Sequence, residues 1–334
     1  KNIFTLCIIL LCSSKIIIAQ TSFSNNGILK ISNATDTFFI NGNFTNNAAA
    51  NFINEGNFFI QGNFINNQTA ALSCNGTIAF TGSNSQSVSS TNALTNITVN
   101  KAAGSVTLGS NIGITGTLKL TSTTSKLSIG GNTLYLIGSL DAGNNGFITG
   151  SQNSNLTIDG SGSFGTLFID QSSNGTSNAL QNFTVNRNNQ TINLGNTLRV
   201  LNVLTPTAGT IASSGNLVMA SSTTNTARIA TANSNNYITG DVTVERYISA
   251  LNNRAYRLLT PTVTTTTTIK ANWQEGVNNT STSVNVSSAT PGYGTHITGT
   301  GGSTNGFDVT QNNSSSLFTY TYGATEANDQ WTAV

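Results

Sequence analysis

The strongest constraint on the fold of this chain is a short internal repeat near its N-terminus. The segment FFINGNFTNN at 38–47 recurs as FFIQGNFINN at 58–67, which sets a period of 20 residues. A unit of this length cannot bury its apolar face alone and becomes stable by stacking on similar units. The repeat therefore favours a coil of short strands that is extended by further coils.

A longer period keeps a second architecture open. NALTNITVN at 92–100 matches NALQNFTVN at 178–186, a shift of 86 residues, and VTLGSN at 106–111 matches INLGNT at 192–197 at the same shift. This period approaches the ~100 residues of an immunoglobulin-like domain, so a string of small β-sandwiches is the alternative. The strict 20-residue repeat favours the solenoid over the sandwiches.

Short stretches such as GTLKLTS at 116–122 and KLSIGGNTLYLIGSL at 126–140 alternate apolar and polar residues and then reach Gly, Asn or Ser. Alternation with a period of two marks strands with one buried face, and the interrupting residues suit turns. We therefore predict an all-β chain in which residues 21–236 form a right-handed parallel β-solenoid almost devoid of helix. The predicted core includes Leu118, Leu120, Leu127, Ile129, Leu134 and Leu136.

The composition excludes several classes of protein. Only 7% of the residues are charged, against about 25% in an average soluble domain. Asn, Ser, Thr and Gly take the place of the missing charge, and 3 Pro are too few for a typical disordered chain. The formal net charge is +2 without any basic stripe or cluster, so we expect neither nucleic acid nor a membrane surface as a partner.

Residues 1–20 read KNIFTLCIILLCSSKIIIAQ, with a basic start, an apolar run and a small-residue exit at Ala19. This pattern predicts a secretory signal peptide, with a buried N-terminal strand as the alternative. The mature chain is then expected to begin near Gln20 or Thr21, and no later run is apolar enough to span a membrane. Cys74 would be the one remaining cysteine, and we expect a plain buried or half-buried thiol.

The composition changes near Tyr237. Both Trp and the single His follow this point, and Glu245, Arg246, Arg254 and Arg257 lie close together in the sequence. We predict that residues 237–334 form a β-rich, partial β-sandwich-like module that is truncated at its C-terminal end. The clustered charges are expected to form ion pairs that orient the junction with the solenoid.

Several phrases in this second region carry a family resemblance. VERYISALNNRAYRLLTPTV, NWQEG, GYGTHITG, NGFDVTQNNSSSLFTY and QWTAV, all within residues 240–334, resemble a module of large secreted Bacteroidetes surface proteins with adhesin-like character. The resemblance implies export by the type IX secretion system. That machinery, the implied partner, reads a C-terminal sorting domain that this sequence does not contain.

A carbohydrate-active enzyme with a groove on the β-helix is the alternative function. Glycoside hydrolysis uses a pair of carboxylates that face each other across a cleft. Asp159 and Asp170 would share a face only if half a coil separated them, and isolated acids in turns are the simpler interpretation. The acids available in the predicted solenoid are Asp36, Glu55, Asp141, Asp159 and Asp170.

The sequence lacks the residues that other kinds of catalytic or ligand-binding site require. His296 in GYGTHITG is the single His and follows no nucleophile motif, so a structural loop residue is expected. A transition-metal site needs several His or Cys, and no calcium-binding loop pattern occurs. The glycine-rich segments 160–165 and 299–306 lack the Lys of a phosphate loop and are interpreted as turns.

The sequence thus predicts no catalytic, cofactor-binding or metal-binding residue. The expected function is that of a secreted or cell-surface structural and adhesive protein. Its repetitive stalk would make weak multivalent contacts with surface glycans or other cells and would display downstream modules.

Overall fold

The computed structural model describes residues 22–143, 145–232, 237–247, 265–273, 297–305, 307, 314–323 and 330–334. The chain divides into two compact units, Lys1–Arg254 and Ala255–Val334. The expected signal peptide at 1–20 lies outside the described residues.

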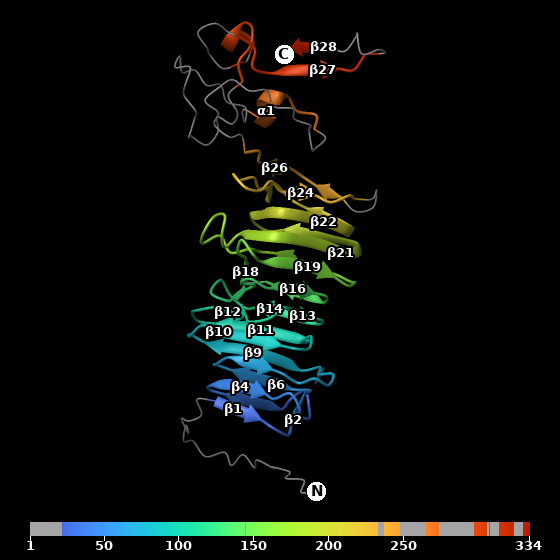
Figure 1. Cartoon of the computed structure of the whole chain (residues 1–334). Coiled ribbons are helices and arrows are strands. Elements are labelled where there is room, and N and C mark those ends of the chain that lie inside the picture. Colours follow the sequence, from blue (N-terminus) through green and yellow to red (C-terminus); the bar gives the residue numbers. More distant parts are fainter. Residues whose placement is uncertain are drawn as a thin grey trace. The chain divides into compact units, whose positions relative to one another are not determined.

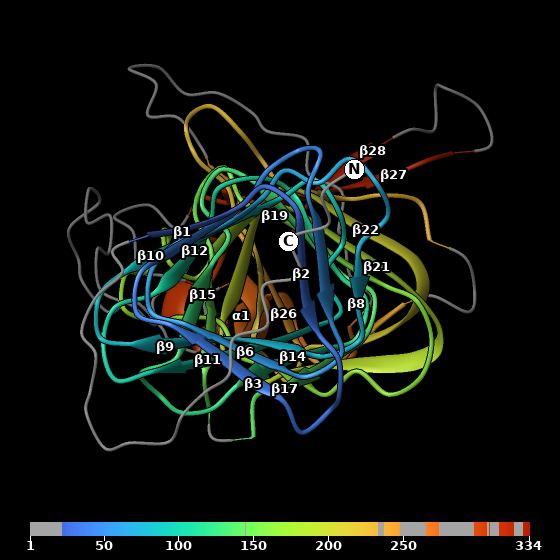
Figure 2. The same ribbon diagram turned by 90° about the horizontal axis from the view of Figure 1, so that it is seen from below.

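The first unit is a parallel β-solenoid of about 10 turns (Figure 1). Each early coil crosses three sheets in turn, and the strands of each sheet gather on one side when the stack is seen from below (Figure 2). Sheet I contains β1 (Ser22–Asn25), β4 (Asn43–Asn46), β7 (Phe64–Asn66), β10 (Gln86–Ser90), β12 (Val106–Leu108), β15 (Lys126–Ser128) and β18 (Phe147–Thr149). Sheet II contains β2 (Ile28–Ile31), β5 (Asn51–Asn54) and β8 (Ser73–Cys74).

Two larger sheets complete the coils. Sheet III contains β3 (Thr37–Ile40), β6 (Asn57–Ile60), β9 (Thr77–Gly82), β11 (Asn96–Lys101), β14 (Thr117–Leu120) and β17 (Ser139–Asp141). Sheet IV has ten strands, which are β13 (Ile112–Ile114), β16 (Thr133–Leu136), β19 (Asn155–Asp159), β20 (Thr166–Leu167), β21 (Ala179–Leu194), β22 (Leu198–Ala212), β23 (Leu217–Met219), β24 (Arg228–Ile229), β25 (Ile238–Thr239) and β26 (Val242–Val244).

The strand pairing confirms the solenoid and excludes the sandwich alternative for this unit. Every pairing between named strands of the first unit is parallel, whereas immunoglobulin-like sandwiches are antiparallel. No helix occurs among the described residues of this unit. The 86-residue repeat has another meaning, because its two copies lie in different sheets. Ile97 belongs to β11 of sheet III, while Phe183, its counterpart in the repeat, belongs to β21 of sheet IV.

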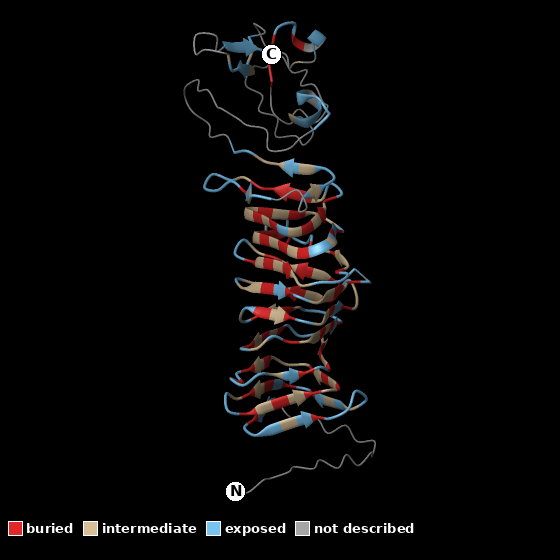
Figure 3. Ribbon diagram, turned by 90° about the vertical axis from the view of Figure 1, so that its right-hand side faces the viewer, coloured by how far each residue is buried: buried red, intermediate tan, exposed pale blue. Residues whose placement is uncertain are grey.

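The core consists of columns of apolar side chains that run along the stack. In sheet III, Phe38 pairs with Phe58, which pairs with Ile78, and the column continues through Ile97 and Leu118. Buried and exposed positions alternate along the strands (Figure 3), as a period of two requires. All six predicted core residues, from Leu118 to Leu136, are buried, which confirms the predicted orientation of their strands.

A buried ladder of asparagines reinforces the first coils. Asn25 Nδ2 donates to Asn46 Oδ1 at 2.7 Å, and Asn46 Nδ2 donates to Asn66 Oδ1 at 2.8 Å, across sequence separations of 21 and 20 residues. Asn66 Nδ2 then donates to Ser90 Oγ at 3.1 Å. Because a buried amide without a partner is costly, this ladder ties the register of each coil to the next. It is the structural counterpart of the 20-residue repeat.

The solenoid continues beyond the boundary that the sequence suggested at residue 236. β25 pairs with β22, and β26 pairs with β23, both in parallel, so stacking reaches Val244. The composition change near Tyr237 is therefore a poor marker of the boundary. Val242 and Val244 keep the alternating pattern of a coil strand. This pattern, and not the charge of the residues that follow, allows β26 to pair with β23.

In the second unit the structure describes the short helix α1 (Ile269–Trp273), the 3-10 helix η1 (Gly302–Asn305) and one antiparallel pair. The pair consists of β27 (Phe318–Thr321) and β28 (Gln330–Ala333), and its Tyr320 and Trp331 rings lie 4.8 Å apart. The second unit thus holds a small antiparallel sheet that is separate from the parallel stack; a β-sandwich-like module around this sheet stays a prediction. None of the described helices has the length and apolar character to cross a membrane.

Candidate functional site

Three of the five acids named above for the predicted solenoid lie in surface contacts, each on a different coil. Asp36 Oδ2 accepts from the backbone N–H of Asn33 at 3.0 Å and shapes a turn. Glu55 accepts from the amide of Asn75 on the next coil. Asp141 forms an ion pair with Lys119 of the neighbouring strand at 3.3 Å, with both side chains about half exposed. Exposed pairs of this kind contribute little to stability.

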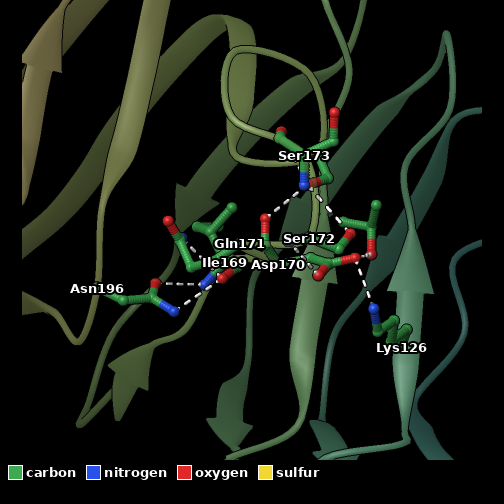
Figure 4. Close-up of polar contacts among 9 residues, drawn as sticks. Lys126, Ile169, Asp170, Gln171, Ser172, Ser173 and Asn196 are labelled. Carbon is green, nitrogen blue, oxygen red and sulfur yellow. Dashed lines mark hydrogen bonds and ion pairs between the residues drawn. The ribbon is translucent and has the colours of Figure 1, made fainter.

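Asp170 stands out because it is 5% exposed and lies at the centre of a polar network. It follows Ile169, which bridges to Ile148 of β18, so it is attached to sheet I. Figure 4 shows its carboxylate turned toward the Lys126 ammonium group from β15, and Lys126 Nζ lies 2.9 Å from Asp170 Oδ2. The hydroxyl of Thr149 donates to the same oxygen at 3.1 Å.

Asp170 also begins a loop that is held closed by hydrogen bonds with serine residues. Asp170 Oδ1 accepts from the backbone N–H of Ser172 at 3.1 Å. Ser177 Oγ accepts from the backbone N–H of Ser173 at 2.8 Å and donates to the carbonyl of Asp170. Such side-chain bonds to nearby backbone are typical of turns that Asp and Ser initiate. This group of hydrogen bonds therefore anchors the loop from Asp170 to Ser177.

The protonation of Asp170 follows from this geometry. Burial disfavours the charged form, but the hydrogen bond and charge of Lys126 and the bonds from Ser172 outweigh it, so the pKa lies below the ordinary value of 3.8. A general acid near neutral pH needs the opposite shift. An ionised Asp170 that is already paired with Lys126 is suited to holding coils together.

Asp159 is placed elsewhere. It ends β19 in sheet IV, where its Oδ1 accepts from the backbone N–H of Gly160 at 2.7 Å and from Asn186 Nδ2 at 3.0 Å. Asp170 shares none of these partners and belongs to the side of sheet I. The two acids that the enzyme hypothesis would pair are thus held by different sheets. Both carboxylates accept from a backbone N–H that follows them, as acids in turns do, but Asp170 is not isolated, because it is buried and paired with Lys126.

We predict that Asp170→Asn lowers the stability of the solenoid by about 1–2 kcal/mol at pH 7, because the bond to Lys126 loses its charge. The folded-state pKa is depressed, so this stabilisation is complete above the unfolded pKa near 4 and disappears as the pH falls through the folded value. Urea unfolding from pH 7 to pH 2 measures it. Wild type and variant should converge at the acid end, and a constant difference across that range would contradict the prediction.

Sequence reasoning missed a buried arginine at the glycine-rich segment 160–165. Arg187 lies on β21 and its Nε donates to the carbonyl of Gly162 at 2.7 Å. Its two terminal nitrogens donate to four further carbonyls, which belong to Ile137, Asp159, Ser161 and Ser163. The guanidinium also lies 5.5 Å from the centre of the Phe164 ring, and burial lowers its pKa. Segment 160–165 is a turn, as predicted, and Arg187 holds it.

A buried lysine closes another turn in a similar way. Lys101 Nζ donates to the carbonyl of Asn84 at 2.5 Å and to Gln86 Oε1 at 2.6 Å, and burial lowers its pKa. Both cations could have been found in the sequence. Arg187 shares the parity of Phe183 and Val185, and Lys101 that of Ile97 and Val99, so alternation places both inside.

The remaining candidates are structural or lie outside the described residues. Cys74 is buried as predicted, and its pKa is raised to about 11, chiefly by burial, which makes a poor nucleophile. His296, Arg254 and Arg257 lie outside the described residues. Glu245 forms its ion pair with Arg199 of β22 at 2.7 Å, while Arg246 donates to the carbonyl of Glu245. The pair therefore fastens the last coils to each other.

Within the part of the chain that the structure describes, no three His, Cys, Asp or Glu side chains gather where they could hold a metal ion. No family model matches the chain, and neither a curated protein nor a solved structure does.

Proposed function

We propose that this chain is a structural and adhesive protein of the cell surface or the secreted space, with the solenoid as a stalk. One observation carries the proposal: overlapping parallel sheets, which run from β1 to β18, from β3 to β17 and from β13 to β26, surround a single stacked core. Each coil contacts mainly its neighbours, so length can be added without changing the fold. That property suits a spacer that displays other modules.

The surface chemistry supports the adhesive part of the proposal. The outer positions of the strands carry mostly Asn, Ser and Thr, which can exchange hydrogen bonds with hydroxyl-rich partners at many coils. Individual contacts of this kind are weak, but their repetition raises the overall affinity when many copies act together. The buried and paired acids described above take part in the fold, so the enzyme alternative gains no support from them.

Export and display at the outer surface belong to the same proposal. They rest on the leader-like residues 1–20 and on the resemblance of residues 240–334 to modules of secreted Bacteroidetes proteins. Brief protease treatment of intact cells that express the chain provides a test. Rapid loss of the chain would agree with display, and full protection on intact cells, combined with cleavage after lysis, would contradict it.

A bead assay tests adhesion. Beads coated with residues 21–334 at increasing density are expected to attach to glycan-coated surfaces, with attachment that rises more steeply than density, because binding is multivalent. Beads coated with the heat-unfolded chain are the control. Attachment no better than this control would contradict the proposal. Release of sugar products from a polysaccharide panel, lost in Asp159→Asn or Asp170→Asn, would favour the enzyme.

A further inference from the structure

An exposed aromatic side chain interrupts the polar surface in the middle of the solenoid. Tyr135 on β16 is 40% exposed, and Ile137 two residues later is 37% exposed. They alternate with the buried Leu134 and Leu136, so both point outward from sheet IV. The other large apolar residues that are well exposed in the described part of the first unit lie in its first coil or after residue 236, and they are Ile28, Phe39, Tyr237 and Tyr247.

The register places a flat area of backbone at Gly113, called the shelf below, beside the Tyr135 ring. Tyr135 pairs with Gly113 on the preceding coil and with Thr157 on the following coil. A methyl group at Gly113 would lie 3.9 Å from Ile137 Cδ1 and 3.3 Å from the Cβ of Ala93. Since Gly113 has no side chain, the space that this position leaves beside Tyr135 is bordered by backbone, by the small Ala93 and by the end of the Ile137 side chain. A flat ring can therefore lie against the tyrosine on that side.

Hydrogen-bonding groups border the shelf on the next coil. Asn155, Thr157 and Asp159 occupy successive outward positions of β19. The side chains of Asn155 and Asp159 are oriented from the following coil, because Asn182 Nδ2 donates to Asn155 Oδ1 at 2.7 Å and Asn186 Nδ2 donates to Asp159 Oδ1 at 3.0 Å. Groups that are held in place before binding lose less conformational freedom on binding.

Charge and size narrow the class of ligand. The outward positions of β13, β16 and β19 carry no Lys or Arg, and Asp159 is their one charge, so an anionic chain would be repelled. A stable protein partner needs about 800 Å² on each side, with a central apolar cluster, and two exposed apolar residues are too few. An aromatic face beside amide, hydroxyl and carboxylate groups complements sugar rings, which have apolar faces and hydroxyl edges.

We propose that the outward face of β13, β16 and β19 binds neutral polysaccharide, with Tyr135 stacking on one sugar ring and Asn155, Thr157 and Asp159 bonding to its hydroxyls. This site deepens the adhesive function proposed above and rests on it. The ligand is a hexose- or pentose-based chain without charged groups that lies across neighbouring coils.

The test is isothermal titration of residues 21–334 with xyloglucan, mixed-linkage β-glucan, galactomannan and arabinoxylan, and with polygalacturonate as the anionic comparison. Binding to at least one neutral polymer is expected. Tyr135→Ala should weaken it about tenfold, as loss of a central aromatic contact does, while Tyr135→Phe keeps the ring and most of the affinity. Phe39→Ala, which removes an exposed aromatic from sheet III, is the matched control and should bind like wild type.

Circular dichroism and thermal melting show that each variant is folded before titration. The proposed site is wrong if Tyr135→Ala binds as tightly as wild type, or if Phe39→Ala is equally impaired. The ligand class is wrong if no neutral polymer binds or if polygalacturonate binds more tightly. The bead assay distinguishes failure of this site from failure of the adhesive function. If wild-type beads attach but no neutral polymer binds, only the proposed site is wrong. If wild-type beads do not attach, the adhesive function is wrong.

Discussion

Replacement of Phe58 by alanine is expected to lower the free energy of unfolding of the solenoid by about 3–5 kcal/mol, the cost of emptying a large buried site. Phe58 is fully buried and lies at the centre of an aromatic cluster. Its ring centre lies between 4.9 and 6.1 Å from those of four other rings, which belong to Phe38, Phe44, Phe52 and Phe64. Strands pinned above and below by parallel ladders can relax only slightly, so the cavity should persist.

The matched control for this substitution is Phe39→Ala. Phe39 lies on the strand that pairs with β6, but its side chain points outward and is 55% exposed. Its truncation should change stability by no more than about 0.5 kcal/mol. Urea unfolding followed by circular dichroism gives the comparison, and hydrogen exchange locates the loss, which is expected at β3, β6 and β9. Equal effects of the two substitutions would contradict the assigned orientation of the strands.

Arg187→Ala should be nearly as damaging, with an expected loss of at least about 3 kcal/mol, because several buried carbonyls lose their donor together. Arg187 supplies hydrogen bonds to five backbone oxygens around the turn at 160–165. Gly160, Gly162 and Gly165 in that turn have positive φ, which glycine adopts without strain, but glycine also leaves the unsupported chain many other conformations. Without the guanidinium, the loop should lose its order as well as its contribution to stability.

Two further variants separate charge from geometry at this position. Arg187→Lys retains the positive charge but not the planar fork of donors, so it should recover only a small part of the loss. Arg228→Ala removes an exposed arginine from β24 and should leave stability almost unchanged. Thermal unfolding and hydrogen exchange of residues 160–165 measure these effects. Full rescue by lysine would show that charge alone matters and would contradict the proposed role of the fork.

The repeat in the sequence determined the architecture of the first unit. A period of 20 residues with apolar alternation has one economical solution, because strands of this length bury their apolar side only by stacking, and the predicted core from Leu118 to Leu136 is buried as expected. The thiol of Cys74 is buried, in agreement with the expectation of a buried or half-buried cysteine. Local chemistry also identified the turn at 160–165, where glycine permits the backbone conformation that the turn requires.

Only the tertiary structure decided which distant residues meet. The sequence gives each residue's parity along its strand but not the coil or sheet that faces it, since loops of different length shift the register between coils. Asp170 thus bonds to Lys126, and Asp159 accepts from Asn186. No local sequence pattern predicts either contact. Alternation along β21 indicates that the side chain of Arg187 points inward. Its contribution to stability, however, depends on hydrogen bonds to carbonyls of another coil. Apolar burial is a property of one residue type, whereas a polar contact is a property of two positions, and only the fold brings those together.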